Sequence, residues 1–78
     1  MGKDVRKDLK RQCAQSYNHL GAVILDQSDL YNAFKDQHPD MAEKFAQIAH
    51  NTNECRKAVL AVANEAWGFD EERLLNYL

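Results

Sequence analysis

The chain has 78 residues, 45% of them hydrophobic, and a formal net charge of −2. This composition is too apolar for a disordered chain, and its length allows one small domain. The near-neutral charge gives no general argument for nucleic-acid binding. No run of eighteen apolar residues is present to span a membrane, and the charged stretch 1–11 lacks the apolar core of a secretory signal.

A first helix is predicted over about residues 4–36. Gly21 lies in its middle and costs about 1 kcal/mol relative to alanine in a helix. The polar stretch 26–29 also interrupts the apolar pattern. We favour one continuous helix. The alternative is a break at residues 26–28, which would fold residues 29–37 back over the hairpin as a lid.

The single proline marks the start of a second helix, predicted over about residues 39–67. Pro39 suits the first helical position, and Gly68 is typical of the residue that follows a helix C-terminus. A short third helix is predicted over about residues 70–77, with Asp70 as its N-cap. The chain is therefore expected to be an all-α, single-domain antiparallel helical hairpin with a short C-terminal helix.

Uncharged residues recur along both long helices at alternating steps of four and three, the repeat of a coiled-coil seam. None of these sixteen positions is charged, although 28% of the chain is charged and about four charges would be expected among them. We predict that the two stripes form the buried seam of the hairpin. The first stripe is Leu9, Cys13, Ser16, Leu20, Val23, Gln27, Leu30 and Phe34, and the second is Met41, Phe45, Ile48, Thr52, Cys55, Val59, Val62 and Ala66.

The two cysteines, Cys13 and Cys55, both belong to these stripes. In the predicted pairing they lie about seven residues apart along the hairpin, or roughly 10 Å, which is too far for a disulfide. We therefore expect two buried, reduced thiols that resist modification until the protein unfolds. Reduced thiols indicate a reducing compartment, so a cytoplasmic location is expected.

Further apolar positions flank the predicted seam, so the hairpin is expected to need another covering layer. The short third helix can cover only one end, which leaves an alanine-rich half near the turn. We predict a homodimer that pairs into a helical bundle, with a larger partner protein or the lid described above as alternatives. The expected self-association residues are Ala42, Ala46, Ala49 and Tyr31.

Both ends of the hairpin carry candidate contacts for another protein. The turn end is acidic, and the end near the C-terminus holds three aromatic residues, a class enriched at interfaces. The candidate interaction residues are Asp36, Asp40, Glu43, Trp67, Phe69 and Tyr77.

The basic N-terminal segment indicates the alternative function, electrostatic binding of phosphate on a lipid or a nucleic acid. Its candidate phosphate contacts are Arg6, Lys7, Lys10 and Arg11. Antiparallel pairing would place Lys10 opposite Glu65 and so neutralise part of the segment. Nucleic acid is therefore the less favoured partner.

Residues suited to catalysis or metal binding are sparse. His50 and Glu54 are four positions apart on one helix face, a spacing that can chelate a metal, but two ligands do not complete a site. No glycine-rich phosphate loop or nucleophile motif is present. We therefore predict a non-enzymatic protein-interaction or adaptor module that needs no metal or cofactor.

Overall fold

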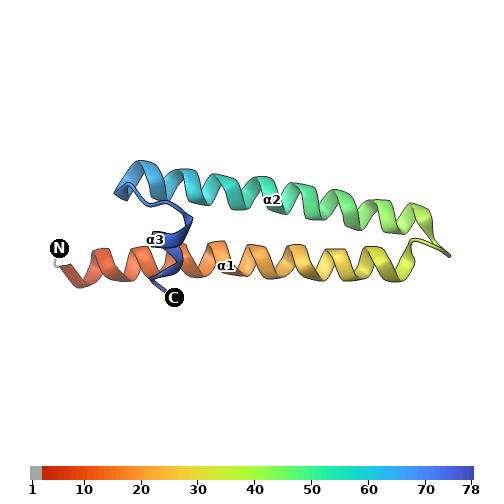
Figure 1. The fold of residues 1–78 in the computed structure, drawn as a ribbon, viewed down its shortest axis with the longest axis horizontal. Coiled ribbons are helices and arrows are strands. Elements are labelled where there is room, and N and C mark those ends of the chain that lie inside the picture. Colours follow the sequence, from red (N-terminus) through yellow and green to blue (C-terminus); the bar gives the residue numbers. More distant parts are fainter. Residues whose placement is uncertain (1–2) are drawn as a thin grey trace.

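The fold is an antiparallel hairpin of two long helices with a short third helix near its open end (Figure 1). The computed structural model describes residues 3–78, with side chains from residue 7 onward. Helix α1 spans Lys3–Phe34, α2 spans Pro39–Trp67 and α3 spans Glu71–Leu75. The molecule is elongated, with extents of 54 × 20 × 18 Å. An all-α helical hairpin, as predicted, is confirmed.

Helix α1 is continuous through residues 26–28, so no lid forms from residues 29–37. It ends at Phe34, two residues before the predicted end, and residues 35–37 form a turn in which the His38 N–H donates to the Phe34 carbonyl at 2.7 Å. Helix α2 has the bounds expected from Pro39 and Gly68. Across the described residues, no helix is both long enough and apolar enough to cross a bilayer.

A glycine turns the chain back onto the hairpin after α2. Gly68 adopts a left-handed φ of 70°, and its N–H donates to the Asn64 carbonyl at 2.7 Å. Glycine adopts this conformation without the steric penalty of a side chain. Asp70 then caps α3 by accepting a hydrogen bond from the Arg73 N–H at 2.9 Å. These local signals place α3 across the open end of the hairpin.

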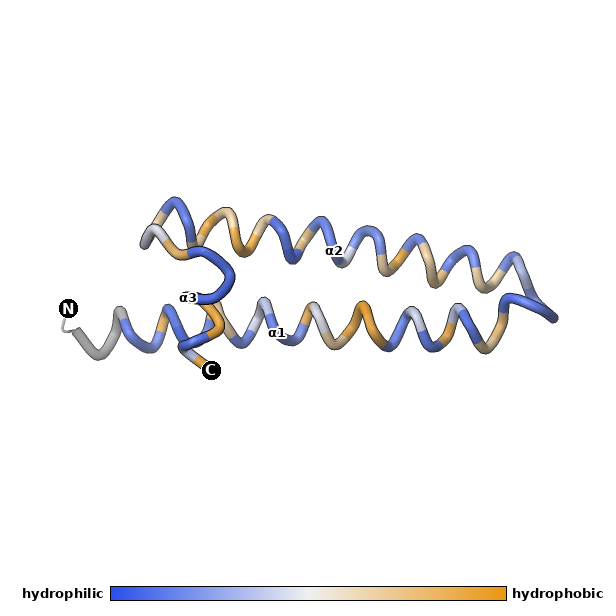
Figure 2. The backbone as a smooth tube through the Cα atoms, viewed as in Figure 1, coloured by the Kyte–Doolittle hydropathy of each residue, from blue (hydrophilic) through white to orange (hydrophobic). Residues whose placement is uncertain are grey.

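The core lies at this open end, where α3 adds a third packing element. Leu74 of α3 is fully buried against the two long helices, beside Tyr17 of α1. Toward the turn only two helices pack against each other, and Ala42 is the one buried residue there among those described. Figure 2 shows that apolar segments nevertheless continue along the full length of both long helices. Much apolar surface therefore has no covering layer.

The buried residues of each long helix follow positions of its predicted stripe by one residue. Seven of the sixteen stripe positions are partly buried and nine are exposed, so the stripes form one edge of the contact between the helices rather than its centre. Phe34 and Phe45, one from each stripe, pack with their ring centroids 5.5 Å apart. The partly buried positions also include Lys10 and Arg56, charged residues that only the folded structure provides with partners. The buried residues of the two long helices are Ala14, Tyr17, Ala42 and Ala63.

Candidate interaction surface

The exposed positions of the two uncharged stripes lie on one side of the hairpin and together form a surface that we call the uncharged face. Its residues are Leu9, Ser16, Val23, Leu30, Met41, Ile48, Cys55, Val62 and Ala66. Both stripes precede the buried positions of their own helix by one residue, which places them on the same flank of an antiparallel pair. A shallow hollow confirms this placement, because Cys13 and Ser16 of α1 line it together with Val59 and Val62 of α2. No residue of α3 lines the hollow.

Large apolar side chains are exposed along this face. Of the nine large hydrophobic side chains that the described residues expose, six belong to the stripes, and each is between 36% and 59% exposed. A single exposed leucine is ordinary, whereas exposed apolar side chains repeated along two packed helices make this face a candidate interaction surface. The six are Leu9, Val23, Leu30, Met41, Ile48 and Val62.

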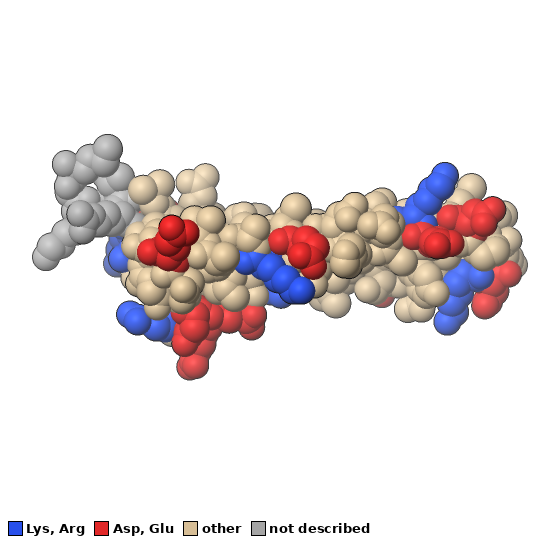
Figure 3. All heavy atoms as spheres, turned by 90° about the horizontal axis from the view of Figure 1, so that it is seen from above, with Lys and Arg blue, Asp and Glu red and all other residues tan. Residues whose placement is uncertain are grey.

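Charged side chains are unevenly placed over the molecule. Figure 3 shows Lys, Arg, Asp and Glu gathered at the two ends and near the middle of one side, with uncharged surface between them. Among the described residues, the one ion pair is Lys57–Glu54 on the exposed surface of α2, with its N and O atoms 3.4 Å apart. Such exposed pairs contribute little to stability.

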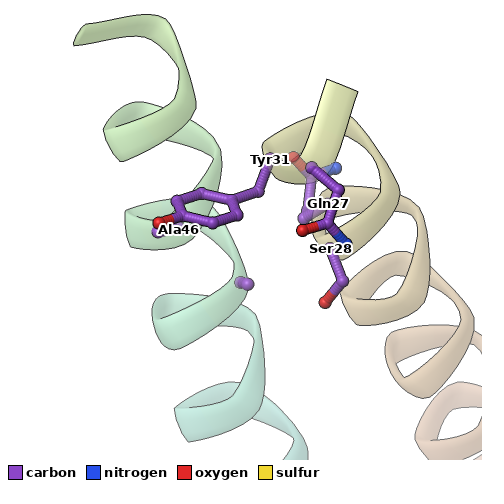
Figure 4. A pocket seen from close by; sticks show the side chains of 6 residues that line it. Gln27, Ser28, Tyr31 and Ala46 are labelled. Atoms are coloured by element: carbon purple, nitrogen blue, oxygen red, sulfur yellow. The ribbon is translucent and has the colours of Figure 1, made fainter. Parts of the chain in front are cut away.

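An alanine-lined groove runs along the other side of the hairpin near the turn. Tyr31, Ala46 and Ala49 line it with Gln27 and Ser28, and the Tyr31 ring reaches across from α1 toward Ala46 of α2 (Figure 4). The Oε1 atom of Gln27 is buried there without a hydrogen-bond partner. Three of the four predicted self-association residues are therefore brought together in one groove.

Ala42, the fourth of these residues, is only 2% exposed. It lines a neighbouring hollow nearer the turn together with Tyr31 and Ala46. Ala42 therefore lies at the base of this surface and offers little area of its own to a second copy of the chain.

The predicted aromatic contact site is largely part of the protein's own core. The ring centroid of Phe69 lies 5.7 Å from that of Trp67 and 5.3 Å from that of Tyr77, and Phe69 is only 4% exposed. The Lys10 ammonium lies 5.5–5.9 Å from all three ring centroids. Cation–π attraction to these rings, rather than the expected pairing with Glu65, therefore holds Lys10.

The charged residues predicted as contacts differ in the solvent exposure of their side chains. The predicted acidic contacts at the turn, Asp36, Asp40 and Glu43, are all exposed. In the basic segment Lys7 and Arg11 are exposed, whereas Lys10 is partly buried against the aromatic rings. The Arg6 side chain lies outside the described residues.

A polar network that the sequence reasoning missed joins all three helices. Arg56 of α2 donates from Nε to the Tyr17 carbonyl of α1 at 3.0 Å, and its guanidinium carbon lies 3.9 Å from the Tyr17 ring centroid. A Cβ atom at Gly21 would lie 3.0–3.2 Å from this guanidinium, so the glycine leaves room for it. The signal in the sequence was Gly21, a glycine in the middle of a long helix, together with Arg56, the single arginine of the helix that pairs with it.

The Tyr17 hydroxyl completes the network by donating a hydrogen bond to the Glu71 carboxylate of α3. Burial and this hydrogen bond both raise the pKa of Tyr17, because they favour its protonated form. The network therefore fixes the position of α3 relative to the long helices. Its arrangement is that of a structural clamp.

The two cysteines differ in exposure. Cys13 is partly buried, and this burial raises the pKa of its thiol. Cys55 is exposed, so the expectation of two buried thiols was wrong for Cys55, which lies at an outward-facing position of its stripe. His50 and Glu54 are both exposed, and no group of three potential metal ligands occurs among the described residues.

Comparison with known proteins identifies no relative of this chain. The chain has no significant match to a protein-family model, to a curated protein or to a solved structure. The surfaces of the molecule are therefore the basis for assigning a function.

Proposed function

We propose that this chain is a non-enzymatic protein-interaction or assembly module that binds a protein partner through the uncharged face. The observation that carries the proposal is the row of exposed apolar side chains along both helices, with no charged residue at any of the sixteen stripe positions. Removing such side chains from water favours the formation of a complex, because the apolar surface is then covered by the partner. A cytoplasmic location, where free cysteines persist, fits this proposal.

The principal alternative is electrostatic binding of phosphate through the basic N-terminal segment. Lys10 is drawn against the aromatic rings, so Lys7 and Arg11 are the exposed cations of this segment among the described side chains. Phosphate binding would weaken steeply with salt, whereas contact through an apolar face would not. The two functions are therefore separable by experiment.

A charge placed on the uncharged face tests the proposal. The variant Val23→Glu/Ile48→Glu introduces carboxylates on both stripes, at side chains that are already 37% and 44% exposed. The matched control is Leu25→Glu, because Leu25 is 68% exposed on α1 but lines the hollow of Gly21 and Arg56 on the other side. Circular dichroism checks that all three proteins keep their helix content.

Tagged wild type and both variants are incubated with an extract of the cells that produce the chain, at low and high salt, and bound proteins are quantified. We expect the double variant to lose proteins that the wild type and Leu25→Glu retain at both salt concentrations. Full retention by the double variant would contradict the proposal. Salt-sensitive binding to anionic vesicles that is lost in Lys7→Gln/Arg11→Gln would establish the alternative instead.

A further inference from the structure

We propose that the occupant of the uncharged face is a second copy of this chain, turned end for end. The two hairpins would then form a four-helix bundle with both α3 helices on the outside. This inference rests on the proposed function, because it names the partner of the same face. It also replaces the alanine-lined groove as the surface of self-association.

The size of the face suits a stable dimer. The hairpin is 54 Å long and about 20 Å wide, so the outline of one long side is about 1,000 Å², which leaves room for the roughly 800 Å² that each partner buries in a standard interface. A short peptide or the turn of another protein would cover only part of it.

The pattern of the face is complementary to itself. Its exposed residues recur every seven positions on both helices, and in the α1 set of Leu9, Ser16, Val23 and Leu30 all except Ser16 are apolar. This spacing allows side chains from two such faces to interdigitate as in a coiled coil, and a two-fold axis brings the same surface from both copies together. Because the stripes carry no charge, pairing the face with itself buries no like charges.

The third helix does not obstruct this pairing. Leu74 packs against Tyr17, Ala14 and Ala63 in the core, and the hollow on the uncharged face is lined by α1 and α2 alone. A second copy can therefore approach along the whole hairpin without displacing α3.

Charge favours the end-for-end orientation. Residues 26–44 contain five acidic and two basic side chains, a net charge of −3, and aligned hairpins would place two such ends together. End-for-end pairing separates them by nearly the 54 Å length of the molecule, far beyond the screening length of about 8 Å at physiological salt. It also brings Lys44 of one copy toward Glu65 of the other, because each follows its stripe by three positions near opposite ends of α2.

Sedimentation equilibrium tests the partner. The wild type and Leu25→Glu are expected to sediment as dimers at micromolar concentration, and Val23→Glu/Ile48→Glu at half that mass. A wild type that is monomeric at several hundred micromolar would overturn this inference. The proposed function would then stand with a different protein as the partner of the uncharged face. A dimer that survives in the double variant but is lost in Ala46→Glu would overturn the inference in favour of the alanine-lined groove.

A distance measurement tests the orientation. A single spin label at Gln37→Cys, in a Cys13→Ala/Cys55→Ser background that still sediments as a dimer, reports the separation of the two turns by pulsed electron resonance. End-for-end pairing is expected to give a separation near the 54 Å length of the molecule. A separation near its 18–20 Å width would show aligned hairpins and overturn the proposed arrangement.

Discussion

The contact between Arg56 and Gly21 makes the sharpest test of how the hairpin is held together. Replacing Arg56 by alanine removes the 3.0 Å hydrogen bond to the Tyr17 carbonyl and the guanidinium that lies 3.9 Å from the Tyr17 ring centroid. A hydrogen bond from a charged group contributes about 1.5–3 kcal/mol. The cation–π contact adds about 0.5–1 kcal/mol.

Two features of the site make the expected loss of stability smaller than these two contributions together. Arg56 is only partly buried, and the Tyr17 carbonyl lies inside α1, where the helix supplies another donor. We therefore expect Arg56→Ala to lower the free energy of unfolding by about 2 kcal/mol, a drop in melting temperature of roughly 10 °C for a domain of this size. Arg56→Lys is expected to recover only part of the loss, because lysine lacks the planar group that stacks on the ring.

Gly21→Ala then reports whether the guanidinium is the reason for the glycine. Alanine favours a helix over glycine by about 1 kcal/mol, but in the wild type its Cβ would lie 3.0–3.2 Å from the Arg56 guanidinium. We expect the substitution to stabilise the Arg56→Ala protein by about 1 kcal/mol and to give little or no gain in the wild type.

Urea unfolding of the four proteins of this cycle, followed by circular dichroism at one fixed protein concentration, measures the coupling. The fixed concentration is needed because self-association would add to the stability of each protein. Equal effects of Gly21→Ala in both backgrounds, within about 0.3 kcal/mol, would refute the reasoning.

Three further outcomes are expected. At submicromolar concentration, a maleimide should label Cys55 at least about tenfold faster than Cys13, because Cys55 is exposed and burial raises the pKa of Cys13; equal rates would contradict the assigned faces. Tyr17→Phe should cost about 1 kcal/mol near neutral pH by removing the hydrogen bond to Glu71. Because the folded protein raises the pKa of Tyr17, the stability that this group contributes is present below pH 10 and is lost as the pH rises through the raised value. The difference between wild type and Tyr17→Phe should therefore shrink in urea titrations above pH 10, and a constant difference would argue against the buried hydroxyl. Leu74→Ala should cost about 2–4 kcal/mol and shift the fluorescence of the single tryptophan to the red, because Leu74 is fully buried where α3 covers the open end; an unshifted spectrum would show that α3 stays docked without it.

The sequence by itself determined the three helices and the ends of α2. Pro39 begins α2, Gly68 ends it and Asp70 caps α3, as the residue types predicted. These features depend on the backbone preferences of one or a few neighbouring residues, which do not change when the chain folds. The continuity of α1 followed in the same way, because an apolar repeat over nine turns outweighed one glycine and a short polar stretch.

Only the tertiary structure decided which side of each helix is buried. Each long helix carries two neighbouring apolar stripes, and a rotation of one residue, about 100° around the helix, exchanges the inner stripe for the outer one. The uncharged stripe was expected inside, yet Lys10 and Arg56 occupy the inner frame. Their charges are accommodated by aromatic rings and by a carbonyl that come from other helices. Those partners are distant in sequence and become neighbours only when the hairpin and α3 pack, so the sequence pattern alone placed the uncharged stripes at the centre of the contact instead of at its edge.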